Sequence, residues 1–179
     1  AGGTLGVTVN GGGTWAGGIQ NGPGSGTTTF TKNGSAALVL TGNSTYTGAT
    51  AVNAGTLEVD GSLGNTAVAV ASGATLSGKG SIGGVVTVGN NGTIAPLPTT
   101  FTLGGLTLQG GSKLNFLLGD GSGSSLIEVN NANGLTLPTA GSAAISLAQG
   151  AGLLGSSYDL IRYNGTFTGN FANLSLATP

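Results

Sequence analysis

The chain has 179 residues with a net charge of −1; 38 are glycine, only 5% are charged, and neither cysteine nor histidine occurs. This composition excludes disulfides, thiolate nucleophiles and the usual Ser–His catalytic pair, and it removes the commonest metal ligand. The four basic residues stand singly, at Lys32, Lys79, Lys113 and Arg162, and no apolar run reaches the roughly 18 residues of a membrane span. We therefore expect no nucleic-acid partner and no membrane insertion by this segment.

A short module recurs along the chain: an apolar residue, then Gly or Asn three positions on, then a large apolar residue three further on. In chain order the copies are Val9/Gly12/Trp15, Leu40/Asn43/Tyr46, the one-residue-shorter Val52/Gly55/Leu57, Val70/Gly73/Leu76, Val88/Asn91/Ile94, Leu108/Gly111/Leu114 and Leu147/Gly150/Leu153. From Val52 the first positions advance by 18, 18 and 20 residues to Leu108, and Val129 and Leu147 continue with steps of 21 and 18. A fixed period near twenty residues predicts a solenoid.

Each copy has the pattern of a strand, a corner and a second strand. Apolar residues alternate before the corner, as at Val68 and Val70, which is typical of half-buried strands. Gly or Asn then tolerates the positive backbone angle that a corner requires. One period is one coil, so the chain length divided by roughly 20 residues predicts a parallel β-helix of about nine coils. We expect one all-β domain over residues 1–179.

Three segments interrupt the pattern, and the end of the chain differs from the rest. The interruptions are 22–26, 95–100 with two prolines that donate no ladder hydrogen bond, and 119–125. Because solenoid loops often carry function, we expect any ligand to contact loops 95–104 and 119–125. The terminal element 153–176 is rich in aromatic residues and is predicted to close or dock the coil; its large side chains include Tyr158, Ile161, Tyr163, Phe167 and Phe171.

Glu58 and Asp60 are the strongest candidates for chemistry. Two residues apart on one strand, they point the same way, while Leu57 and Val59 point inward. Such a pair could act in acid–base catalysis or hold calcium, and Asp120 and Glu128 could join it only through a contact made by the fold. We favour the simpler interpretation for this pair and for Lys79, Lys113 and Arg162: charges on exposed strands discourage lateral pairing.

Three further patterns have simple structural explanations. The sequence Gly78–Gly83 satisfies G-x-G-x-x-G, but a strand follows it where a nucleotide site needs a helix, so we interpret it as a turn. A column of threonines could form a flat hydroxyl array of the ice-binding kind, although threonine suits strands generally; its members are Thr14, Thr45, Thr56, Thr75 and Thr93. Trp15, Tyr46 and Tyr163 could stack on sugars, with core filling favoured for Trp15 and Tyr46. We predict no catalytic, cofactor or metal site.

Residues 38–59, LVLTGNSTYTGATAVNAGTLEV, have a distinctive pattern of an apolar strand, Thr-Gly-x-Asn-x-Tyr-x-Gly, and then Val-x-x-Gly-x-Leu-x-Val. This segment resembles the passenger-associated transport repeat of bacterial autotransporters, and a looser similarity covers residues 35–176. The resemblance implies a right-handed parallel β-helix that is exported to the cell exterior or surface, usually without catalysis, and often as a stem for other domains. This sequence differs from many passengers at 97–100, where it has Leu-Pro-Thr-Thr and they have a Gly-Asn-Ser-Pro-Gly loop.

Three classes of function remain. The favoured one is a non-enzymatic extracellular structural module that associates with itself end to end into a stalk or fibre, because neither residues 1–3 nor residues 177–179 look like a charged or helical cap. The alternative is an adhesin or a passenger stem that supports secretion and folding and binds glycan or host protein through its loops. A polysaccharide-cleaving enzyme needs clustered charges, whereas nine charged residues are spread over this chain.

Overall fold

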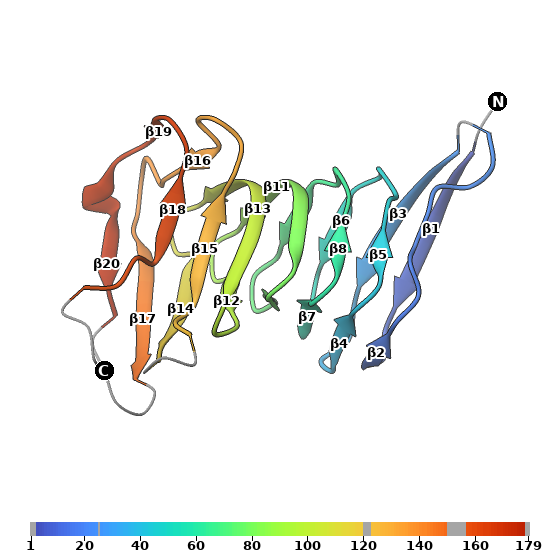
Figure 1. The fold of residues 1–179 in the computed structure, drawn as a ribbon, viewed down its shortest axis with the longest axis horizontal. Helices are drawn as coiled ribbons and strands as arrows, with labels where there is room; N and C mark the ends of the chain where they lie inside the picture. Colours follow the sequence, from blue (N-terminus) through green and yellow to red (C-terminus); the bar gives the residue numbers. More distant parts are fainter. Residues whose placement is uncertain (1–2, 25, 120–122, 150–156, 178–179) are drawn as a thin grey trace.

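The strands stack into a rod of parallel coils. The computed structural model describes residues 3–24, 26–119, 123–149 and 157–177. Every strand pairing within these ranges is parallel. Successive strands lie side by side along the long axis, and the two ends of the chain lie toward opposite ends of the rod (Figure 1). The expected all-β parallel β-helix is confirmed.

Two sheets run the length of the rod. The path of the first, in order, is β1 (Thr4–Val9), β3 (Thr27–Lys32), β6 (Thr50–Val52), β9 (Val68–Val70), β11 (Ser81–Val88), β13 (Thr100–Leu108), β15 (Leu126–Val129) and β18 (Ile161–Tyr163). Four short strands extend this sheet sideways: β5 (Asn43–Ser44), β8 (Ser62–Leu63), β16 (Leu135–Thr136) and β19 (Phe167–Thr168). The second sheet contains β2 (Gly13–Trp15), β4 (Ala37–Leu40), β7 (Thr56–Val59), β10 (Thr75–Gly78), β12 (Thr93–Pro96), β14 (Lys113–Leu118), β17 (Ala143–Gln149) and β20 (Leu174–Leu176).

Each path contains eight strands in the described part of the chain, which corresponds to eight coils where the sequence period gave about nine. Residues in register are 18 apart in the middle of the rod, as for Thr50 and Val68. Coils near the two ends are longer: Thr4 pairs with Thr27, and Ile127 pairs with Ile161. Longer end coils use more residues per turn, so the chain makes fewer coils.

The core is built from inward columns of apolar side chains. Alternation along each strand turns every second residue inward, and the parallel register stacks these residues on one another. The longest column runs through Leu38, Leu57, Leu76, Ile94, Leu114, Ile145 and Leu176. Its members from Leu38 to Leu114 are buried, and they belong to a hydrophobic core of residues from Phe30 to Ala143.

Corners between the two sheets confirm the predicted role of Gly and Asn. Backbone φ is positive at Gly55, Gly73, Asn91 and Gly111, the middle positions of four successive modules. The corners also stack, because the amide of Gly73 donates to the carbonyl of Asn91 and the amide of Asn91 donates to that of Gly111. The register of Val52, Val70, Val88 and Leu108 follows the predicted steps of 18, 18 and 20.

The module assignments outside this region were wrong in four places. Gly12 has no positive φ, which occurs at Gly13 instead, and Asn43 lies in β5 with no positive φ, so neither is the predicted corner. Val129 pairs with Leu103, and Leu147 pairs with Phe116 in the other sheet, so neither continues the column of Leu108. The 119–125 insertion lengthens its coil and moves the following residues to other faces. Gly150 and Leu153 lie outside the described residues.

The loop expected at 95–100 is shorter than predicted. Ala95 and Pro96 belong to β12, and Pro96 lies in register with Gly78 of the preceding coil. Proline still limits the ladder, because β12 pairs with the following β14 only through Thr93 and Ile94. Residues 100–104, also expected in a loop, form the first half of β13.

Candidate functional site

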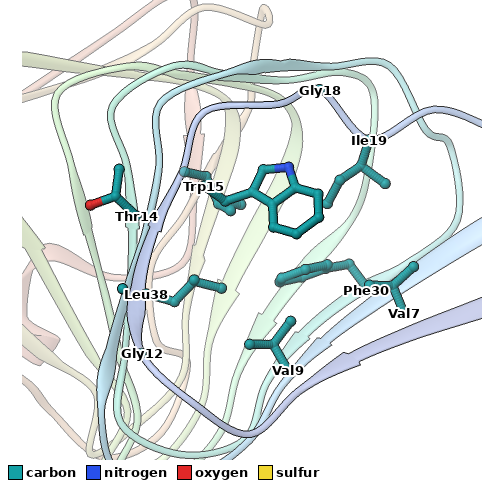
Figure 2. A pocket seen from close by; sticks show the side chains of 11 residues that line it. Val7, Val9, Gly12, Thr14, Trp15, Gly18, Ile19, Phe30 and Leu38 are labelled. Atoms are coloured by element: carbon teal, nitrogen blue, oxygen red, sulfur yellow. The ribbon is translucent and has the colours of Figure 1, made fainter.

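The N-terminal end of the rod contains an open apolar cavity of about 410 Å³ between the first two coils. Figure 2 shows Val7, Val9 and Phe30 on one side of it and Trp15 and Ile19 across it. Its full lining is Val7, Val9, Gly12, Gly13, Thr14, Trp15, Gly18, Ile19, Phe30, Leu38 and Leu40. These residues come from β1 to β4 and from the segments that join β1 to β2 and β2 to β3, so the hollow is the uncovered end of the core.

A missing side chain creates this hollow. Gly13 lies in register with Leu38, so it occupies the next position of the long apolar column without contributing a side chain. Trp15 lies in register with buried Leu40 and is therefore in an inward column, as expected. It nevertheless remains 53% exposed, so the favoured core-filling role was wrong for Trp15. Its side chain lines the open cavity rather than a closed core.

The other end of the rod also exposes large apolar side chains. Leu176 of β20 is 68% exposed although it extends the same column as Ile145. Phe171, in the 3₁₀ helix η1 (Phe171–Asn173), is half exposed. Its ring centroid lies 4.3 Å from that of Phe167, which in turn lies 6.1 Å from Tyr163, both in edge-on geometry. Tyr163, Phe167 and Phe171 thus form one cluster of edge-on aromatic contacts at this end.

The carboxylates of Glu58 and Asp60 have a local basic partner. Leu57 and Val59 are fully buried, so the strand directions follow the prediction. The Lys79 ammonium lies 3.4 Å from an Asp60 carboxylate oxygen, across neighbouring coils. Burial and the charge of Asp60 raise the pKa of Glu58 above its ordinary value. Within the described ranges no three His, Cys, Asp or Glu side chains gather as metal ligands, and Asp120 lies outside those ranges.

The glycine-rich segment 78–83 is a turn, as expected. Gly78 ends β10 with φ of +144°, and β11 starts at Ser81 without any intervening helix. A Cβ atom on Gly78 would meet the Val59 carbonyl of the preceding coil. Close packing of neighbouring backbones therefore requires glycine here.

The threonine column is shorter than predicted. Thr56, Thr75 and Thr93 are in register, and Lys113 follows them. Thr14 pairs with Val39 in a different column, and Thr45 lies outside the strands, so both assignments were wrong. A threonine at the same place in each module does not always fall in the same column. The first two modules lack a positive φ at their middle residues, Gly12 and Asn43, so their second strands start at a different point.

Tyr46 is fully buried, which confirms its predicted place in the core. Its hydroxyl lies 2.6 Å from Thr50 Oγ1, which lies 3.0 Å from Thr66 Oγ1. Thr66 in turn donates to the carbonyl of Gly48 at 2.6 Å. This chain of hydroxyls satisfies the buried polar atoms, and burial raises the pKa of Tyr46.

The two expected ligand loops meet in space. Ser125 is buried and donates from Oγ to the carbonyl of Pro96 at 2.8 Å, while the amide of Leu117 donates to Ser125 Oγ at 3.2 Å. The amide of Gly119 donates to Ser124 Oγ at 3.2 Å. These bonds tie the described parts of loop 119–125 to β12 and β14, and residues 120–122 lie outside the description.

Lys32 was missed as a special residue by the sequence reasoning, which treated it as one of several isolated charges. It is fully buried and stacks in an inward column between Val9 and Val52. Its ammonium donates to three carbonyl oxygens, those of Asn33, Gly34 and Ala54, at 2.7, 2.8 and 3.2 Å. Burial lowers its pKa. In the sequence, this arrangement could be recognised only from the placement of a lysine in register with the apolar residues Val9 and Val52.

Comparison with known proteins identifies similar sequences. The family model described as passenger-associated-transport-repeat matches residues 30–59. Over 165 residues, 87% of this chain, the sequence is 36% identical to a protein named adhesin BmaC autotransporter from Brucella suis biovar 1 (strain 1330). Over 164 residues, 84% of this chain, it is 31% identical to a protein named extracellular serine protease from Serratia marcescens.

The matched regions are small parts of these relatives, 5% of the Brucella protein and 15% of the Serratia protein. The matches confirm the resemblance seen at residues 38–59, and with it the expected extracellular or cell-surface location. No helix in the described ranges is long and apolar enough to cross a membrane.

Proposed function

We propose that this module of an autotransporter-like passenger, identified by its passenger-associated transport repeat, is a non-enzymatic structural element that stacks end to end with a second copy of itself. Stacked copies would form a stalk or fibre outside the cell. One observation carries the proposal: the two ends of the same apolar column are complementary in shape.

The complementarity involves Leu176 and Gly13. At one end of the column the side chain of Leu176 is exposed. At the other end Gly13, in register with Leu38, has no side chain to fill its position. If β2 of a second copy adds to β20 in the same parallel sense, Gly13 becomes the next column position after Leu176. The leucine side chain then enters the cavity of about 410 Å³ that Gly13 leaves open. Burial of apolar surface would stabilise this junction.

The backbone supports the same arrangement. Among the described residues, β1 and β2 pair only with β3 and β4, and β20 pairs only with β17. The outer edges of these strands therefore have free amides and carbonyls, which an added parallel strand would satisfy. In the register that places Gly13 after Leu176, β2 and β20 overlap at that one position, and Thr14 continues the ladder beside Ala177.

Three observations support a structural role over catalysis. The chain has no His or Cys, and the paired carboxylates Glu58 and Asp60 lie beside Lys79. The cavity at the N-terminal end is lined mainly by aliphatic and aromatic side chains and glycines. Such a lining suits packing against another apolar surface better than proton transfer.

Sedimentation velocity of the 179-residue protein over a range of concentrations tests the proposal. We expect species that lengthen with concentration in steps of one rod. Leu176→Glu should abolish them, because a carboxylate would have to enter the apolar cavity. Val85→Glu is the matched control, since Val85 is also an exposed apolar residue, 43% exposed, but lies in the middle of the rod.

Two results would refute end-to-end stacking. One is a monomer at every concentration, which would leave a passenger stem whose ends meet other coils of a longer chain. The other is an equal loss of association in both variants, because the junction would then not involve the end of the column.

A further inference from the structure

A second candidate site lies along the side of the rod. Two hollows of about 260 Å³ each adjoin at Asn130, which lines both, and together they are called the groove below. The first includes Ser81, Thr102 and Asn131, and the second includes Glu128 and Arg162. The strands concerned, β11, β13, β15 and β18, are consecutive in the first sheet. The groove therefore runs parallel to the rod axis across four coils.

Glycine hollows out this groove. β11 and β13 bend where their register shifts between Ile82 and Val85. Gly83 and Gly104 lie at this bend and line the hollow, and a Cβ atom on Gly104 would meet the carbonyl of Gly83. Side chains are thus excluded by the close approach of neighbouring coils. The hollow beside Ser81 is therefore lined partly by backbone, whereas larger side chains, including Arg162 and Tyr163, line the hollow beside Glu128.

A row of outward polar side chains runs along the groove. Ser62, Ser81, Thr102, Glu128 and Arg162 are in register on five successive strands, about 4.8 Å apart as in any sheet. Their inward neighbours are buried apolar residues such as Ile82 and Leu103, so the row faces solvent.

These side chains are available to a ligand. Ser81, Thr102, Asn130 and Asn131 make no side-chain hydrogen bond within the described residues, and Asn130 and Asn131 are exposed. Arg162 donates to Asp159 with one guanidinium nitrogen at 3.2 Å and retains other donors. Arg162 is paired with Asp159, so Glu128 leaves this part of the rod with a net charge of −1. The groove thus offers hydrogen-bond donors and acceptors, and its charge disfavours acidic ligands.

We propose that this groove binds a neutral polysaccharide chain, laid along the rod axis. Sugar hydroxyls donate and accept hydrogen bonds, as do the serine and threonine hydroxyls and asparagine amides here. An extended chain matches the row of polar side chains, which lie in register along the rod axis. A protein partner fits less well, because Tyr163 is the one aromatic side chain in the described lining and the apolar lining residues such as Ile82 and Leu103 are buried. The proposal is independent of end-to-end stacking.

An array of neutral and charged glycans, probed with the labelled 179-residue protein, tests the proposal, followed by calorimetric titration of the neutral glycans retained. Thr102→Val and Asn130→Ala should each weaken binding about tenfold or more, since each removes a donor and acceptor from the groove. Thr107→Val is the matched control. Thr107 lies in the same strand β13 with similar exposure but outside both hollows, and valine suits strands as well as threonine does.

The proposal predicts retention of neutral glycans with affinity lost in the two groove variants and kept in Thr107→Val. It is overturned if the array retains no neutral glycan. Binding of acidic glycans or of a protein that is unaffected by Thr102→Val would also overturn it, because the ligand would then use another surface. Circular dichroism of each variant checks that its fold is intact.

Discussion

Replacement of buried Lys32 by methionine removes the ammonium but keeps an unbranched stem of similar length in the column between Val9 and Val52. Three carbonyl oxygens, from Asn33, Gly34 and Ala54, then lose their donor. A fully buried acceptor left without a partner costs about 1–3 kcal/mol; these three bonds are only partly buried, and relief from burying the charge offsets part of the sum. We expect Lys32→Met to lower the free energy of unfolding by about 1–2 kcal/mol.

Urea unfolding followed by circular dichroism measures this loss, with Lys113→Met as the control. Lys113 is an exposed, outward residue of β14, so its replacement should change stability by less than about 0.5 kcal/mol. If Lys32→Met proved as stable as the parent protein, the three hydrogen bonds would contribute nothing. A gain in stability would mean that desolvation of the charge outweighs them.

The pH dependence gives an independent check on Lys32. Because burial lowers its pKa in the folded protein below 10.5, the unfolded chain binds more protons between the two pKa values. The stability of the parent relative to Lys32→Met should therefore increase as pH rises through that window. A relative stability that falls or stays flat there would contradict a lowered pKa.

Three further predictions concern the stack itself. Leu76→Ala should cost about 3–5 kcal/mol in urea unfolding because Leu76 is fully buried; a loss below about 1 kcal/mol would contradict a tight column. Gly78→Ala should cost at least about 2 kcal/mol, since φ is +144° and a Cβ atom would meet the Val59 carbonyl; unchanged thermal stability would contradict that approach. The pKa of Glu58 is raised above 4.5, so parent stability should fall relative to Glu58→Gln as pH rises through the folded-state pKa, and parallel profiles would refute this.

The middle of the rod could be predicted from the sequence to the residue. Between Val52 and Leu108, alternation defines the inward positions and each corner residue with positive φ ends a strand, so constant spacing gives the register directly. These signals are local, and every coil repeats them.

The far half of the rod could not be predicted in this way. The 119–125 insertion lengthens one coil. The column in which Val129 or Leu147 lies then depends on how many residues the loop takes up before the next strand begins. An apolar residue followed by glycine looks the same on either face. The module therefore identifies a strand end but not its place in the coil.

The candidate sites depend on contacts between coils, which a single module does not encode. Lys32 stood in the sequence only as one of four isolated basic residues, but its donors are satisfied by corner carbonyls of its own coil and the next. The cavity beside Gly13 and the groove beside Gly104 both arise from absent side chains. Glycine in this sequence is so frequent that its role at these two positions appears only when the neighbouring coil is known.

Cryo-electron microscopy of the purified protein at high concentration tests end-to-end stacking most directly. We expect filaments in which all copies share one polarity. The strand spacing of about 4.8 Å should continue through each junction, and Leu176 of one copy should fill the cavity beside Gly13 of the next. Isolated rods, or pairs joined through the same end, would contradict it.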